Sequence, residues 1–483
     1  MNNSKLVELY KTLATIEKKQ FGLYVNSPFF NTNRQVIRLN QYIHSAIETN
    51  KEDQLDKTKT FIHLFGKGKY DKQKVSTVMT FLMSLLENFI SQQKIDKKHF
   101  LQKEQLLIEL RERNLDKHFI SNSNDYHTKL QKKEIQDSNY FYEHYVLERE
   151  LDQFFLKKAV RKNDESLQHM SDNLDTFYLS EKLKNLCEMV NRKNIIGAEY
   201  DLKLLKELLA YIHENTQHFR TIPAVYIYYK ILLLLLESEK PLHFTELKQA
   251  LDKCHKLFSK EEAQLMYLYP QNYCIKKINS GKSEYLLELF SINEALLTGE
   301  IIFEGKYLSQ WDYKNMISVG LKLNKFEWTK GFIEQYKIRM APEFRQNAYE
   351  YNLALFHFAK KDFKSALKLL QLVEFTDVFY HIGSKSMLLK IYYESEEVES
   401  FYSLVDAFKV YLVRNKKISV YQRQMYQNLL KYTKQAFNLK VKTGGASIPS
   451  NEKAVKKLKA GIERNKNQAD FSWLLERVNE LAN

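Results

Sequence analysis

The stretch that decides the fold is residues 347–373, NAYEYNLALFHFAKKDFKSALKLLQLV. Two apolar patterns of helical spacing flank a short polar turn at Lys361 and Asp362. Ala354 and Ala366 place one small residue on each predicted helix, and Phe363 directly follows the turn. Small residues let the axes of two antiparallel helices approach closely, and an aromatic side chain can then fill the remaining space. The stretch therefore predicts a tightly packed helical hairpin.

Weaker copies of this pattern lie on either side of it. Upstream, the turn Leu323-Asn324-Lys325-Phe326 is followed by Thr329, and downstream, Ser395-Glu396-Glu397-Val398 is followed by Phe401. The copies depart from the central pattern where small residues are expected, at Ile317, Leu389 and Phe401. The turns recur every 35 to 37 residues, which predicts stacked helical hairpins.

Over residues 310–410 the chain resembles the tetratricopeptide repeat, whose period is about 34 residues. The residues that carry the resemblance in the central copy are Leu353, Ala354, Asp362, Phe363, Ala366 and Leu370. The resemblance implies an α-solenoid whose first helices line a groove that binds extended peptides or partner helices. Carried over residue by residue, the groove positions are Trp311, Lys314, Ser318, Leu321, Ala348, Tyr351, Leu355, Phe358, Gly383, Ser386, Lys390 and Tyr393. The alternative interpretation of Tyr351 and Phe358 is packing against a neighbouring helix.

Composition supports an all-α fold for the rest of the chain. Its 483 residues include only 13 Gly and 6 Pro, too few for the tight turns that β-sandwiches, barrels and Gly-looped nucleotide-binding folds require. We expect a helical N-terminal unit at 1–120, helical hairpins at 121–440, a linker at 441–450 and C-terminal capping helices at 451–483. The polar stretch Ser121–Asp125 and the pair Gly444-Gly445 suggest the boundaries.

Positive charge is concentrated near the C-terminus. Residues 409–466 carry 15 basic and two acidic residues, almost the whole net charge of +15. Such a surface can attract a polyanion, and Tyr421, Tyr426 and Tyr432 lie among the basic residues. The candidate polyanion-binding residues are Lys416, Lys417, Arg423, Lys431, Lys434, Lys453, Lys456, Lys457 and Lys459. The alternative is a solvated face that keeps the protein soluble, with the tyrosines in the core.

Patterns typical of enzymes are not found in the sequence. No phosphate-binding loop or nucleophile elbow occurs. His213 and His218 are five residues apart, which does not place two metal ligands on one helix face. We therefore expect no catalytic residues, no cofactor, no metal and no small-molecule substrate.

The same sequence predicts a cytoplasmic protein. Its three cysteines are widely separated, as is typical of a reducing compartment. The most apolar stretch, 224–236, is too short to span a bilayer and predicts a fully buried helix. The two function hypotheses are a scaffold that binds a protein or peptide in the groove and, alternatively, a protein that binds RNA or DNA through its basic C-terminal region.

Overall fold

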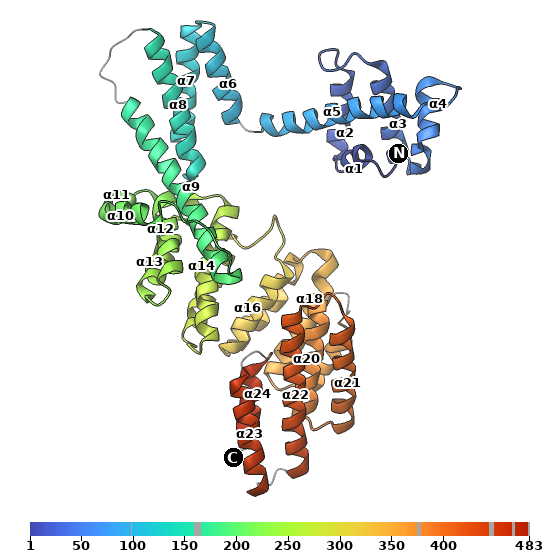
Figure 1. The fold of residues 1–483 in the computed structure, drawn as a ribbon, viewed down its shortest axis with the longest axis vertical. Coiled ribbons are helices and arrows are strands. Elements are labelled where there is room, and N and C mark those ends of the chain that lie inside the picture. Colours follow the sequence, from blue (N-terminus) through green and yellow to red (C-terminus); the bar gives the residue numbers. More distant parts are fainter. Residues whose placement is uncertain (98, 159–165, 374–377, 444–448, 466–468, 482–483) are drawn as a thin grey trace. The chain divides into compact units, whose positions relative to one another are not determined.

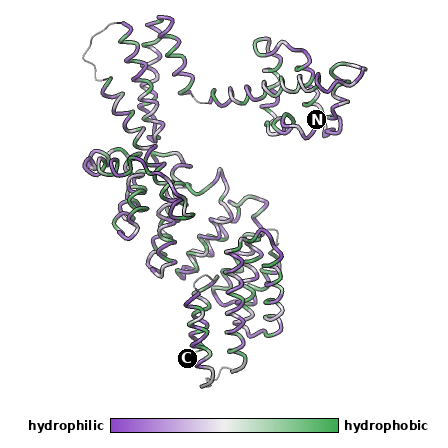
Figure 2. Tube along the Cα trace, viewed as in Figure 1, coloured by the Kyte–Doolittle hydropathy of each residue, from purple (hydrophilic) through white to green (hydrophobic). Residues whose placement is uncertain are grey.

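The computed structural model describes residues 1–483 except 98, 159–165, 374–377, 444–448, 466–468 and 482–483 (Figure 1). All elements of regular structure in the described residues are helices, and only two isolated β-bridges occur among them. The all-α prediction is confirmed. Green and purple alternate along most helices in Figure 2, because apolar and polar residues recur at helical spacing.

The chain divides into two compact units, Met1–Asn185 and Leu186–Asn483. The helices of the first unit are α1 (Lys5–Lys11), α2 (Thr15–Asn26), α3 (Arg34–Glu48), α4 (Lys57–Phe65), α5 (Lys72–Asp96), α6 (His99–Glu112), α7 (Asp116–Gln131), α8 (Ser138–Lys157) and the first part of α9 (Ser166–Ile196). Helices α1 to α5 surround one core, in which Tyr10, Phe21 and Leu39 are fully buried. Helices α6 to α8 surround a second core, where Phe119 stacks on Phe154.

The predicted domain boundary at 120/121 differs from this division. The polar stretch Ser121–Asp125 lies inside α7, where two of its side chains bond to carbonyls of the same helix. Asn122 donates to the carbonyl of His118 at 2.9 Å, and Ser123 donates to that of Ile120 at 3.0 Å. These bonds let residues typical of loops continue a helix.

A buried histidine in the first unit predicts acid sensitivity. Burial, with the nearby charges of His127 and Lys133, lowers the pKa of His144 to about 4, and its Nε2 has no hydrogen-bond partner. The unfolded chain, with an ordinary histidine pKa of about 6.5, binds this proton more readily. Stability should therefore fall as pH drops from about 6.5 to 4. Thermal unfolding across this range should show a smaller loss for His144→Gln than for the wild type; parallel curves would contradict the assignment.

The second unit contains the remaining helices, each packed on its neighbours in the chain. After the end of α9 they are α10 (Leu205–Glu214), α11 (Thr216–Phe219), α12 (Pro223–Leu236), α13 (Pro241–Cys254), α14 (Lys260–Asn279), α15 (Tyr285–Thr298), α16 (Gln310–Lys322), α17 (Phe326–Tyr336), α18 (Pro342–Ala359), α19 (Phe363–Leu370), α20 (Val378–Glu394), α21 (Val398–Arg414), α22 (Val420–Thr443), α23 (Pro449–Arg464) and α24 (Phe471–Glu480). Helix α12 is buried along most of its length, as its apolar sequence predicts. None of the helices in the described ranges combines the length and apolar character needed to cross a bilayer.

The three predicted turns have the same backbone conformation. Asn324, Lys361 and Glu396 all adopt a left-handed conformation, with φ of 56°, 61° and 57°. In each case the next residue donates its N–H to a carbonyl five residues earlier, and a new helix starts one residue later. This is a helix C-terminal motif of the Schellman type, which also ends α3, α6 and α15. The spacing of 35 to 37 residues is therefore present in the backbone.

Close approach between paired helices occurs at small residues. Ala354 of α18 and Ala366 of α19 are both fully buried. In the α16–α17 pair the small residue is Gly320, where a Cβ would lie 2.4 Å from Oγ1 of Thr329. The sequence comparison placed this contact at Ile317, one helical turn away.

The two expected C-terminal helices are present as α23 and α24, and both pack on α22. Their buried residues share one core with α20, α21 and α22; these residues are Val455, Leu458, Ile462, Leu474 and Val478, with Ala469 from the segment between the two helices. Of the predicted linker at 441–450, residues 444–448 lie outside the described residues, while 441–443 belong to α22 and 449–450 to α23.

Candidate functional site

Helices α16, α18 and α20, which carry the mapped groove residues, lie side by side in the second unit. Lys314 Nζ of α16 lies 5.3 Å from the ring centroid of Tyr351 on α18. The Tyr351 ring in turn meets Tyr380 of α20 edge-on, at 5.0 Å between centroids. Trp311 stacks on the same Tyr380 at 5.9 Å. Residues from three helices therefore form one continuous cluster.

A second cation–ring pair extends this cluster along α18 and α20. Lys390 Nζ lies 5.3 Å from the ring centroid of Phe358. We call Trp311, Lys314, Tyr351, Phe358 and Lys390 the lysine–aromatic face. Cations over aromatic rings are held there by the ring quadrupole, so both ammonium groups have defined positions.

Gly383 of α20 makes room for the central ring of the lysine–aromatic face. A Cβ at this position would lie 2.4 Å from the hydroxyl oxygen of Tyr351. Tyr351 is only 4% exposed, and burial raises the pKa of its hydroxyl. The glycine thus acts through packing and offers no side chain to a ligand.

The mapped residues differ in how much a partner could contact them. Trp311 is exposed, whereas Lys314, Ser318, Leu355, Phe358 and Lys390 are half-buried. Tyr351, Ser386 and Tyr393 are buried and contact other parts of the chain. For Tyr351 and Tyr393 the geometry matches packing between helices, which is the alternative the sequence left open for Tyr351.

An aspartate from the C-terminal segment is bound next to the lysine–aromatic face. Ser386 Oγ donates to Asp470 Oδ2 at 2.6 Å, and Lys390 Nζ lies 3.1 Å from Asp470 Oδ1. Burial acts to raise the pKa of Asp470, but the charge of Lys390 and the hydrogen bonds from Ser386 and Lys390 outweigh it. The pKa is lowered as a result, with a further contribution from Lys322. The carboxylate is thus held in its charged form.

Helix α24 follows this aspartate and makes a second polar contact with α20. Trp473 Nε1 donates to Glu394 Oε1 at 3.0 Å, and Arg477 Nη1 lies 3.1 and 3.2 Å from the two Glu394 oxygens. The Trp473 ring also meets Tyr393 edge-on at 5.4 Å. Leu474 and Val478, on the other side of the helix, are fully buried. The sequence analysis predicted capping helices at 451–483 but missed Asp470 and Glu394.

The candidate polyanion-binding residues lie on α22, on α23 and in the turn before α22. Lys416, Lys417, Lys431, Lys453, Lys456 and Lys457 are exposed, while Arg423, Lys434 and Lys459 are half-buried. Arg423 bonds to the carbonyl of Ile418, Lys434 lies over the Tyr402 ring, and Lys456 pairs with Glu452. Lys431 and Lys457 line one pocket between α22 and α23. Of the tyrosines, Tyr421 is 62% exposed, whereas Tyr432 is buried.

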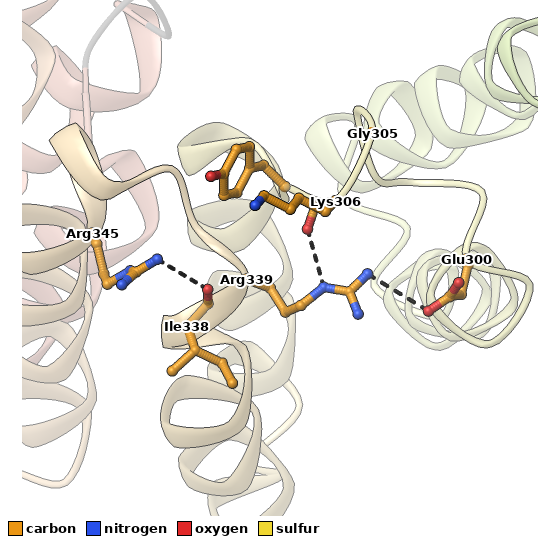
Figure 3. A pocket seen from close by; sticks show the side chains of 7 residues that line it. Glu300, Gly305, Lys306, Ile338, Arg339 and Arg345 are labelled. Atoms are coloured by element: carbon orange, nitrogen blue, oxygen red, sulfur yellow. Dashed lines mark hydrogen bonds and ion pairs between the residues drawn. The ribbon is translucent and has the colours of Figure 1, made fainter.

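Another pocket lies between the loop before α16 and the turn before α18 (Figure 3). Its two guanidinium groups already have partners. Arg339 bonds to the carbonyl of Lys306 and pairs with Glu300, and Arg345 bonds to the carbonyls of Ile338 and Met340. Arg339 joins the loop to the turn and Arg345 joins α18 to the turn, so both arginines have a structural role.

Potential metal ligands do not gather in the described ranges: no group of three or more His, Cys, Asp or Glu side chains there could hold a metal ion. No family model matches the chain, and no curated protein sequence matches it.

Proposed function

We propose that this protein is a non-enzymatic scaffold that binds a protein or peptide partner on the lysine–aromatic face. In this proposal the second unit is a solenoid of tetratricopeptide-like hairpins and acts in the cytoplasm. The common backbone conformation at Asn324, Lys361 and Glu396 supports the repeat, because equivalent turns at near-equal spacing stack successive hairpins in the same way.

The observation that carries the proposal is the convergence of Lys314 and Lys390 on aromatic rings across three adjacent helices. Both lysines contact aromatic rings and are half-buried. Exposed Trp311 extends the surface with an aromatic side chain of the kind that anchors protein interfaces. A face of this composition favours an acidic partner with apolar side chains.

Affinity capture from source cells, with and without nuclease, tests this proposal. The Lys314→Glu variant should retain at least tenfold less of the partner that the wild-type chain captures, because the new carboxylate repels an acidic segment. Lys330→Glu is the matched control, since Lys330 is an exposed lysine on neighbouring α17. Equal capture by wild type and Lys314→Glu, or loss of the partner with nuclease, would contradict the proposal.

The second candidate function is binding of RNA or DNA through the basic C-terminal region. The specific observation in its favour is the pocket that Lys431 and Lys457 share, near the exposed Lys453 and Lys456 on α23. A gel-shift titration against salt separates the two functions. Phosphate contacts lose affinity steeply with salt, whereas a contact dominated by aromatic groups does so weakly.

A further inference from the structure

The C-terminal segment, residues 469–481, occupies one end of the surface where the proposed partner would bind. Lys390 makes two contacts at once, one with the Phe358 ring of the lysine–aromatic face and one with Asp470. Any external segment that reached Lys390 would compete with the carboxylate of Asp470. The chain therefore carries its own occupant of this site.

The electrostatic arrangement explains why an acidic side chain binds at this end. Lys390 and Lys322 both attract the carboxylate of Asp470, and Ser386 donates a hydrogen bond to it. An incoming carboxylate would gain the same attraction.

The contacts of α24 define the rest of the recognition pattern. Trp473 and Arg477 are four residues apart and lie along one side of α24, and Asp470 is the residue directly before this helix. Trp473 and Arg477 both reach Glu394, one turn of α20 beyond Lys390. Along α20 the basic Lys390 is followed by the acidic Glu394. Along the segment that packs on it the acidic Asp470 is followed by the basic Arg477, so each charge meets its opposite.

The apolar side of α24 supplies the remaining contact. Leu474 and Val478 are fully buried in the core that also contains Phe437 of α22. An occupant must therefore be an amphipathic helix, with apolar residues one and five positions after the aromatic residue.

We propose that residues 469–481 are a built-in ligand of this surface and that the external partner is a helical segment with the same pattern. That pattern is an acidic side chain, an aromatic residue three positions later and an arginine or lysine four positions after that. The partner binds by displacing α24. This inference rests on the proposed function, because it identifies the partner and the regulation of the same surface.

A synthetic peptide of residues 465–483 with a fluorescent label tests the inference by anisotropy. The receptor is the full-length chain, either wild type or with Arg477→Glu and Leu474→Asp, which remove its own helix from the site. The peptide should bind the double variant at least tenfold more tightly than the wild type, because a tethered ligand has a high effective concentration. Equal or weaker binding to the double variant would overturn the inference.

Two controls assign the binding to the contacts described. Adding Lys390→Glu to the double variant should weaken peptide binding at least tenfold. A peptide with Arg477→Glu should bind poorly to the double variant and regain affinity when the receptor carries Glu394→Arg. If neither Lys390→Glu in the receptor nor Arg477→Glu in the peptide weakens binding, the inference is overturned. If circular dichroism shows that the double variant is unfolded, Arg477→Glu alone is the receptor and the same criteria decide.

This experiment requires no cellular partner, so its failure is distinct from failure of the proposed function. Suppose that capture of the partner depends on Lys314 but that the peptide does not bind the double variant. The scaffold function would then stand, and the built-in ligand would be refuted. Conversely, the peptide should release the captured partner from the wild-type chain if both use the same surface. Retention of the partner at saturating peptide would show that they do not.

Discussion

Replacing Phe437 with alanine should lower the free energy of unfolding of the second unit by about 3–5 kcal/mol. Phe437 is fully buried on α22 and stacks on Phe401 of α21 at 4.0 Å between centroids. It also contacts Tyr393 of α20 and Tyr402. Truncation removes these contacts and leaves a cavity where three helices meet.

Denaturant unfolding followed by circular dichroism provides the measurement. Tyr421→Ala is the control, since Tyr421 lies on the same helix and is 62% exposed. Its effect should be within about 0.5 kcal/mol. A loss below about 1 kcal/mol for Phe437→Ala would mean that this aromatic cluster does not join α22 to α20 and α21.

The second prediction concerns the close approach of α16 and α17. Gly320→Ala places a methyl group 2.4 Å from Thr329 Oγ1 and 3.2 Å from the Trp328 ring. Thr329 is fully buried and bonds to the carbonyl of Lys325, so it cannot easily move. Overpacking costs about 1–3 kcal/mol. This exceeds the gain of up to about 1 kcal/mol in helix propensity.

Gly331 offers a matched control on α17, because a Cβ there would meet nothing within 4 Å. Gly331→Ala should raise stability by about 0.5–1 kcal/mol, since glycine inside a helix loses the most conformational entropy on folding. Melting temperatures of the two variants should therefore move in opposite directions. A gain in stability for Gly320→Ala would show that the helices are farther apart than described.

Local sequence signals predicted the elements well where a single residue type determines the backbone. Pro223 and Pro342 begin α12 and α18, because a residue that lacks an N–H group and has a fixed φ fits the first turn of a helix. Polar side chains can also bond to their own helix, as Asn122 does. The polar stretch Ser121–Asp125 therefore suggested a domain boundary at a place where α7 is continuous.

The polar contacts of the candidate site could not be predicted from the sequence. Asp470 and Ser386 are 84 residues apart, and no local pattern connects an aspartate before one helix with a serine on another helix. In the sequence, nothing distinguishes Glu394 from other charged residues near helix ends. Its role follows from its contacts with Trp473 and Arg477 in the folded chain. By contrast, the cation–ring pairs of Lys314 and Lys390 join residues that the repeat comparison had already assigned to one surface.

Photo-crosslinking from single positions tests most directly where a partner binds. A photoreactive phenylalanine analogue would replace Leu355 on the proposed surface, Lys364 on α19 of the same hairpin, or Lys457 in the basic region; Leu355 is half-buried and the other two are exposed. We predict that irradiation in source cells yields a discrete protein adduct from position 355 that survives nuclease, and none from position 364. Adducts that form only from position 457 and disappear with nuclease would contradict a protein-binding scaffold.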